Sequence, residues 1–110
     1  MKIENTKAQM RKGVLEYCIL LVLDGKPLYA SDIIDELKNS KMIVVEGTLY
    51  PLLTRLKNAG LLAYNWEEST QGPPRKYYEL TDTGKEFVHE LGNSWNELVE
   101  AVGTIKASKS

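Results

Sequence analysis

Residues Gly47 to Leu62 read GTLYPLLTRLKNAGLL. Four leucines of this stretch recur at i, i+3, i+4 and i+7, which is the spacing of one apolar face of an α-helix. They are Leu49, Leu52, Leu53 and Leu56. Pro51 lies among them, and a proline costs little only in the first turn, where backbone N–H groups have no partner within the helix. We therefore expect a short helix with Thr48 as its N-cap and Gly60 ending it in a left-handed conformation.

The other side chains of this segment lie on the opposite face of the predicted helix. They are Gly47, Tyr50, Pro51, Thr54, Arg55 and Asn58. Apart from the proline ring, these side chains are hydrogen-bonding groups of moderate size. Such groups suit base edges and phosphates better than a protein core. The face opposite the leucines is therefore a candidate recognition surface.

Two more helices are predicted before this segment. The first runs from about Asn5 to Leu23 and is nearly apolar all round in its second half, as in a helix buried on more than one side. Asp24-Gly25-Lys26-Pro27 ends it. The second runs from about Tyr29 to Asn39 and repeats the helical spacing of apolar residues. Those residues are Ala30, Ile33, Ile34 and Leu37.

A β-hairpin is predicted after the segment. Residues 62–66 alternate with period two, and residues 76–80 are rich in strand-forming types. We expect residues 67–75, which contain a Gly-Pro-Pro sequence, to form a long and partly rigid tip. Gln71, Arg75 and Lys76 flank this tip, which would hold them against a phosphate backbone or a minor groove.

A last helix is predicted to begin at Thr81, its expected N-cap. Its apolar residues are spaced three and four apart, which is the a/d seam of a helix that lies along another helix. They are Val88, Leu91, Trp95, Leu98, Val102 and Ile105.

The order of these elements is that of a winged helix-turn-helix domain. The predicted fold class is α+β, mostly α, with a three-helix core, a two-stranded wing and a C-terminal dimerisation helix. We assign residues 1–80 to the DNA-binding domain with its N-terminal helix, and residues 81–110 to the dimerisation helix and a short tail, within one structural unit. In this docking mode the amino end of the third helix lies nearest the bases. Thr48, Tyr50, Thr54 and Arg55 therefore join the wing residues as candidate DNA contacts.

The composition indicates one cytoplasmic domain without catalytic or metal chemistry. The net charge of −1 argues weakly against nucleic acid, although cations gather in residues 2–12 and carboxylates in residues 79–100. The longest apolar run, Tyr17 to Leu23, is far too short to span a bilayer, and no signal peptide is visible. Cys18 is the only cysteine. We find no nucleophile and base set, metal-ligand cluster or phosphate loop, so we expect no enzyme and no cofactor.

Two motifs resemble the PadR family of bacterial transcriptional regulators. That family has a recognition helix of the type G-T-L-Y-P-x-L-x-R-L and a wing that closes in R-K-Y-Y-x-L-T-x-x-G. The matching residues here are Gly47, Thr48, Leu49, Tyr50, Pro51, Leu53, Arg55 and Leu56, then Arg75, Lys76, Tyr77, Tyr78, Leu80, Thr81 and Gly84. With one helix after the wing, the chain resembles the short-tailed branch. One departure is Ala30, where such proteins commonly carry glycine after the tyrosine.

The resemblance implies a homodimer in which the last helix packs with the first helix of the partner. It also implies a backbone contact by Tyr29 and a repressor of a nearby operon, bound to a pseudo-palindromic operator. Drug-sensing members of the short-tailed branch suggest a small planar effector stacked on Trp95, with Tyr17 and Met10 as neighbours. The alternative for Trp95 is a large seam residue that fills the dimer core. The alternative for the whole chain is a winged-helix protein-interaction module that does not bind DNA.

Overall fold

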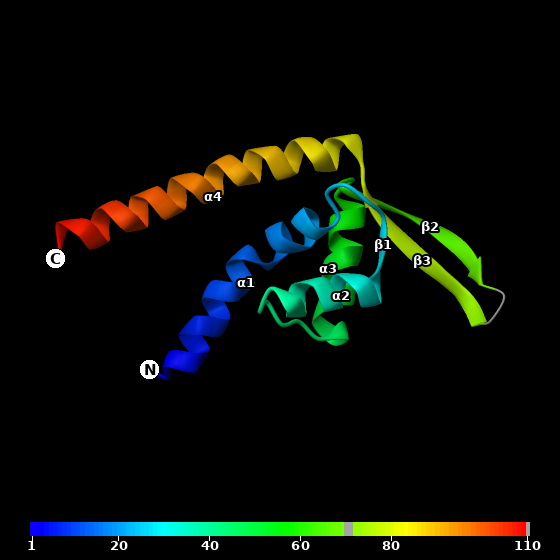
Figure 1. Ribbon diagram of the computed structural model, residues 1–110, viewed down its shortest axis with the longest axis horizontal. Helices are drawn as coiled ribbons and strands as arrows, with labels where there is room; N and C mark the ends of the chain where they lie inside the picture. Colours follow the sequence, from blue (N-terminus) through cyan, green and yellow to red (C-terminus); the bar gives the residue numbers. More distant parts are fainter. Residues whose placement is uncertain (70–71, 110) are drawn as a thin grey trace.

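The computed structural model describes residues 1–69 and 72–109 of the chain. In chain order these residues form α1 (Ile3–Val22), β1 (Leu28–Tyr29), α2 (Ala30–Asn39), α3 (Glu46–Asn58), β2 (Leu62–Ser69), β3 (Gly72–Leu80) and α4 (Asp82–Ser108). Three helices gather around one end of an antiparallel sheet, and the sheet projects away from them as a wing (Figure 1). Both termini lie at the end of the molecule opposite the wing. The predicted mostly helical winged fold is thus confirmed.

The core lies where α1, α2 and α3 meet the base of the sheet. Its largest fully buried side chains are Ile19, Leu20, Leu23, Ile33, Leu49 and Leu53. Leu56 is also buried, so three of the four leucines on the predicted apolar face of α3 face inward as predicted. Leu52, the fourth, is only partly buried against the core. Burial of such side chains contributes about 1.5–3 kcal/mol each relative to leaving them in water.

The start of α3 corrects one prediction. The helix begins at Glu46, with extended Val45 as its N-cap, and Thr48 is not the cap. The N–H groups of Thr48 and Leu49 both donate to the carbonyl oxygen of Val45 at 3.0 Å. Pro51 therefore lies in the second turn, where it removes the bond that an N–H would make to the carbonyl of residue 47. In the link before α3, Val44 is buried in the core.

The end of α3 agrees with the sequence. Gly60 has φ +81°, a left-handed conformation that glycine adopts without steric cost. Its N–H donates to the carbonyl of Lys57, and the N–H of Leu61 donates to the carbonyl of Leu56, both at 3.0 Å. This is a Schellman cap, and the buried side chains of Leu56 and Leu61 complete it.

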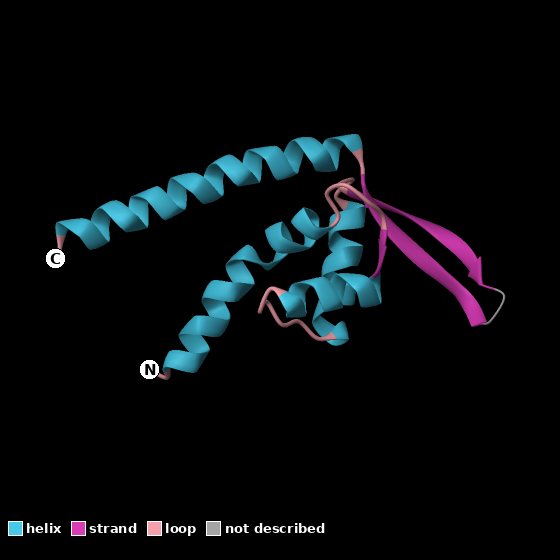
Figure 2. Ribbon diagram, viewed as in Figure 1, coloured by secondary structure: helices cyan, strands magenta, loops and turns pink. Residues whose placement is uncertain are grey.

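The sheet is larger than predicted. Its strand order is β1-β3-β2, and all neighbours are antiparallel (Figure 2). The additional strand β1 contains Tyr29, which we predicted as the first residue of a helix. Strand β2 extends to Ser69, and strand β3 begins at Gly72. The prediction of a long tip over residues 67–75 is therefore wrong. Pro73 and Pro74 lie inside β3, beyond the part that pairs with β1, where one edge of the strand needs no donors.

Helix α4 is joined firmly to the core at its start. Thr81 is its N-cap as predicted, and its side chain accepts a 2.9 Å hydrogen bond from the N–H of Gly84. Val88 is buried in the core. Beyond this turn α4 extends away from the helical core, and α1 and α4 diverge towards their free ends (Figure 1). Within the described residues, no helix is long and apolar enough to cross a membrane.

Candidate nucleic-acid interface

The outward face of α3 borders a hollow of about 500 Å³ between this helix and the wing. Five predicted DNA contacts line the hollow, and they come from three different parts of the chain. They are Tyr29, Tyr50, Thr54, Arg75 and Lys76. Tyr50 is 48% exposed, and Thr54 and Arg75 are also exposed. The fold thus gathers phenol, hydroxyl and cationic groups beside one helix face, which is the chemistry that contacts bases and phosphates.

Lys76 is held over aromatic rings of the wing. Its Nζ lies 4.4 Å from the ring centre of Tyr64 and 5.2 Å from that of Trp66. Lys57 of α3 also approaches Tyr64, with its Nζ 5.4 Å from the ring centre. Tyr64 therefore contacts one lysine from α3 and one from the wing. We name Tyr64, Trp66, Lys57 and Lys76 the cation–aromatic cluster.

Sequence reasoning missed three members of this cluster. The antiparallel register pairs Trp66 with Lys76 and Tyr64 with Tyr78, which sets their side chains on one face of the hairpin. The alternation of residues 62–66 was a usable signal, since residues 64 and 66 share a face in any strand. Lys57 had no such signal, because its approach to Tyr64 depends on how α3 packs beside β2.

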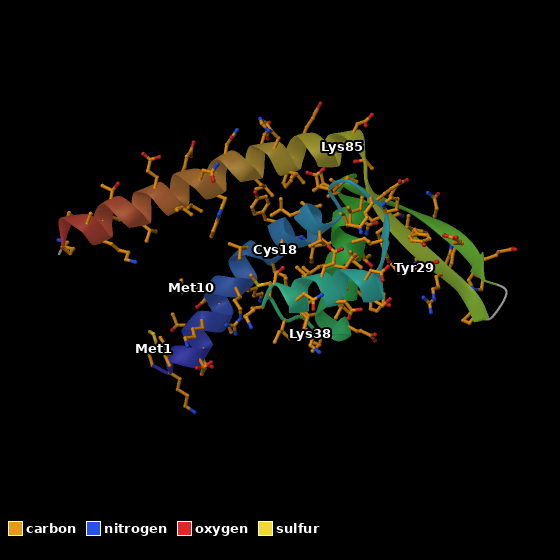
Figure 3. All side chains as sticks on the ribbon, viewed as in Figure 1. Met1, Met10, Cys18, Tyr29, Lys38 and Lys85 are labelled. Carbon is orange, nitrogen blue, oxygen red and sulfur yellow. The ribbon has the colours of Figure 1, made fainter. Side chains whose placement is uncertain are left out.

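Arg75 and Tyr29 lie together on a second aromatic stack. The rings of Tyr29 and Tyr77 are stacked with centroids 3.9 Å apart, and the Arg75 guanidinium carbon lies 5.1 Å from the ring centre of Tyr29. Hydrogen bonding with the Tyr29 side chain raises the pKa of Tyr77 to about 12. The Tyr29 N–H donates to a carboxylate oxygen of Asp32 at 3.1 Å, which fixes the backbone at the start of α2. Figure 3 shows Tyr29 beside the strands of the wing.

The remaining predicted DNA contacts lie elsewhere. Arg55 points towards α1, and its Nη1 lies 3.0 Å from Oε1 of Glu16 in an ion pair. Thr48 lines the same side of α3 as Arg55, in a hollow walled by α1 and the link before α3. Gln71 lies outside the described residues. The fold therefore separates Thr48 and Arg55 from the group that faces the wing.

The predicted dimerisation seam is buried at one end and exposed at the other. Val88 is buried and Leu91 is half-buried, but Leu98, Val102 and Ile105 are 58%, 53% and 60% exposed in the single chain. Phe87, Trp95 and Val99 are further exposed apolar side chains of α4. We name the exposed residues 95, 98, 99, 102 and 105 the α4 strip.

Of the three predicted ligand contacts, Tyr17 lies near Trp95 of α4, whereas Met10 lies farther along α1. A side chain carbon at Gly92 would lie 3.2 Å from the hydroxyl oxygen of Tyr17, so Tyr17 contacts α4 one turn before Trp95. Met10 is 72% exposed on the part of α1 that diverges from α4 (Figure 3).

Among the residues the structure describes, no group of three or more His, Cys, Asp or Glu side chains is placed to hold a metal ion. Burial raises the pKa of the Cys18 thiol, which disfavours the reactive thiolate.

Comparison with known proteins decides the family. Residues 19–90 match the Transcriptional regulator PadR-like family, and they include α2, α3, the whole wing and the start of α4. The chain belongs to the PadR family. The two sequence motifs noted above thus identified it correctly, and the members of this family are transcriptional regulators rather than enzymes.

Solved PadR structures share the arrangement described here. A PadR-like transcription factor from Bacteroides fragilis is 66% identical, with 92% of this chain and 98% of that chain covered and a TM-score of 0.79. A PadR family regulator from Eggerthella lenta is 32% identical, with 94% and 90% covered and a TM-score of 0.86. Bacillus subtilis PadR, solved in complex with operator DNA, is 28% identical, with 71% and 46% covered and a TM-score of 0.66.

Proposed function

We propose that this PadR-family chain is a homodimeric, sequence-specific DNA-binding repressor of a nearby operon, acting in the cytoplasm. One observation carries the proposal. Leu49, Leu53 and Leu56 of α3 are buried, while Tyr50 and Thr54 of the same helix face outward beside Arg75 and Lys76 of the wing. A helix so placed has a polar face free for base edges, with cations beside it for the backbone.

In the proposed complex, α3 enters the major groove and the wing follows the neighbouring phosphate backbone. Tyr50 and Thr54 would contact base edges, and Arg75 and Lys76 would neutralise phosphates. The operator complex of Bacillus subtilis PadR supports DNA as the partner. Tyr29 would contribute a backbone contact, because the capped start of α2 and the Tyr77 stack hold it at the edge of the same hollow.

The proposed dimer covers the α4 strip. Large exposed apolar side chains are costly on a monomer and mark an interaction surface when they are contiguous. A second copy is the occupant that the seam spacing favours, because a/d residues pack best against another helix. Two copies related by a two-fold axis would place two recognition helices about 10 bp apart on a pseudo-palindromic operator.

The proposed effector site is the space beside Trp95. Tyr17 lies against α4 one turn away, so two aromatic side chains would border a planar molecule held between the subunits. Such a molecule would release the operator by favouring a different spacing of the two recognition helices. Met10 would join this site only through the arrangement of α1 in the dimer.

A fluorescence anisotropy titration on the DNA upstream of its own gene tests the proposal. We expect binding that is at least about a thousandfold tighter than to scrambled DNA and that weakens steeply with salt. Arg75→Ala should weaken binding to both DNAs and reduce the slope of log K against log salt by about 0.9. Binding that is absent or insensitive to salt would contradict the proposal and favour the protein-interaction module, to which the net charge of −1 is suited.

A further inference from the structure

A second hollow, of about 680 Å³, borders α3 on the side away from the wing. Its walls are one face of α1, the link before α3, and the amino-terminal part of α3. From α1 it takes Arg11, Lys12 and Glu16, and from α3 it takes Gly47, Thr48 and Arg55. The recognition helix therefore has a hollow on each of its two sides, and both hollows contain cations.

The charge of this second hollow is not balanced within the chain. Glu16 is the single acidic side chain that lines it, and Arg55 already pairs with Glu16 at 3.0 Å. Arg11 and Lys12 are exposed, and within residues 1–69 and 72–109 no carboxylate forms a salt bridge with either. Among the described residues, Arg11 and Lys12 are therefore two cations beside α3 that form no ion pair, and the hollow carries more positive than negative side chains.

The width of the DNA major groove indicates which group Arg11 and Lys12 could contact. A helix with its side chains is about 10–12 Å in diameter, and the major groove is about 12 Å wide. A helix inserted into the groove therefore lies between two phosphate backbones. The cations of the wing can reach one backbone only, because they lie on one side of α3.

We infer that Arg11 and Lys12 of α1 contact the phosphodiester backbone on the other side of the groove. This inference rests on the proposed function and adds a second wall to the DNA-binding surface. Arg55 then bridges the two parts, because its ion pair with Glu16 joins the outward face of α3 to the helix that carries Arg11 and Lys12.

Gly47 is consistent with the inference. It lies inside α3 and lines this hollow, yet it has no left-handed backbone, and a side chain carbon there would meet nothing within 4 Å. Gly13 and Gly103 also lie in helices with nothing within 4 Å of an added carbon, so this open space is not peculiar to Gly47. The absent side chain does leave room for another molecule to approach this side of α3 closely.

The test compares Arg11→Ala/Lys12→Ala with Lys85→Ala in anisotropy titrations at four salt concentrations. Lys85 is the matched control, because it is an exposed lysine at the start of α4 and borders a different hollow with Leu23 and Gly25 (Figure 3). The double variant should lower the salt slope by about 1.8, from two phosphates at about 0.9 each, on operator and scrambled DNA alike. The charge-preserving variant Arg11→Lys/Lys12→Arg should have a salt slope close to that of the wild type. Lys85→Ala should have the same salt slope as the wild type.

Two results would overturn the inference. One is a double variant with the same slope as the wild type. The other is a double variant that sediments as a monomer where the wild type is a dimer, since Arg11 and Lys12 would then contact the partner subunit. Failure of the proposed function looks different from both, because the wild-type chain itself would then show no salt-dependent binding.

Discussion

The hydroxyl of Thr81 donates a 2.6 Å hydrogen bond to the carbonyl oxygen of Gly60. Gly60 ends the recognition helix α3, and Thr81 caps the start of α4, so this bond joins the two helices directly. The N–H of Thr81 also donates to the carbonyl of Leu61 at 3.1 Å. We expect a reorientation of α4 at the proposed dimer interface to move the end of α3 through these two hydrogen bonds.

Adding a single side chain carbon at Gly84 tests how closely α4 packs against Leu61 at this junction. A side chain carbon at residue 84 would collide with the carbonyl oxygen of Leu61. Gly84→Ala should therefore lower the free energy of unfolding by about 1–3 kcal/mol, the usual cost of overpacking. The measurement is urea unfolding followed by circular dichroism. Gly103→Ala is the control on the same helix, because nothing lies within 4 Å of its added carbon, and it should raise stability by up to about 1 kcal/mol.

Equal unfolding midpoints for Gly84→Ala and the wild type would contradict this description of the junction. A destabilised Gly84→Ala should also bind the operator more weakly at temperatures where it remains folded. That result would link the fit of α4 against Leu61 to the placement of α3.

Tyr64 should couple the wing to the recognition helix through the cation–aromatic cluster. Tyr64→Leu removes the ring that Lys57 and Lys76 approach, while Tyr64→Phe keeps it. An exposed cation–aromatic contact contributes about 0.5–1 kcal/mol, so Tyr64→Leu should weaken operator binding roughly two- to fivefold for each lysine that loses its position. Anisotropy at one fixed salt concentration measures the difference. Equal affinities for the Leu and Phe variants would show that the ring plays no part in holding the two lysines.

Leu98 tests the α4 strip. Leu98→Asp places a charge among apolar side chains that the proposed dimer would bury, so the variant should sediment as a monomer at micromolar concentration. Losing the second recognition helix should then weaken operator binding by about a hundredfold or more. Glu100→Asp, a conservative change at an exposed position of the same helix, should remain dimeric. A Leu98→Asp chain that still sediments as a dimer would place the dimer interface elsewhere.

Tyr77 should titrate later than an ordinary tyrosine. Its pKa rises from 10.0 to about 12 because of hydrogen bonding with the Tyr29 side chain, so the neutral phenol is favoured in the folded chain. Its contribution to stability should be complete below pH 10 and should be lost as the pH rises towards 12. Burial also raises the pKa of Tyr78, so absorbance at the tyrosinate band should show two late-ionising tyrosines in the wild type. The delay of Tyr77 alone should disappear in Tyr29→Phe. An unchanged delay would assign the shift to another cause.

The sequence predicted those features that local rules control. The helical spacing predicted that Leu49, Leu53 and Leu56 lie in the core. The preferences of helix ends predicted Gly60 at the end of α3 and Thr81 at the start of α4. The start of α3 escaped prediction, because Val45 caps the helix without a side chain bond and the threonine at position 48 was the more usual candidate.

The parts of the site that sequence reasoning missed depend on tertiary contacts. Arg55 and Glu16 lie on different helices, and no spacing rule relates them before the fold is known. Strand β1 has only two residues, too few for a periodic pattern. The Gly-Pro-Pro sequence indicated a turn, but strand pairing with β2 continues to Gly72 and places the prolines in β3.

In the proposed complex, the two α3 helices of the dimer enter successive major grooves of one operator. Hydroxyl-radical footprinting of the wild-type dimer on its own upstream DNA tests it most directly, because this reagent reports protection of the backbone whatever the sequence. We expect two protected stretches about 10 bp apart, centre to centre, and related by a two-fold axis. Uniform cleavage, or a single protected stretch without a symmetry-related partner, would contradict it.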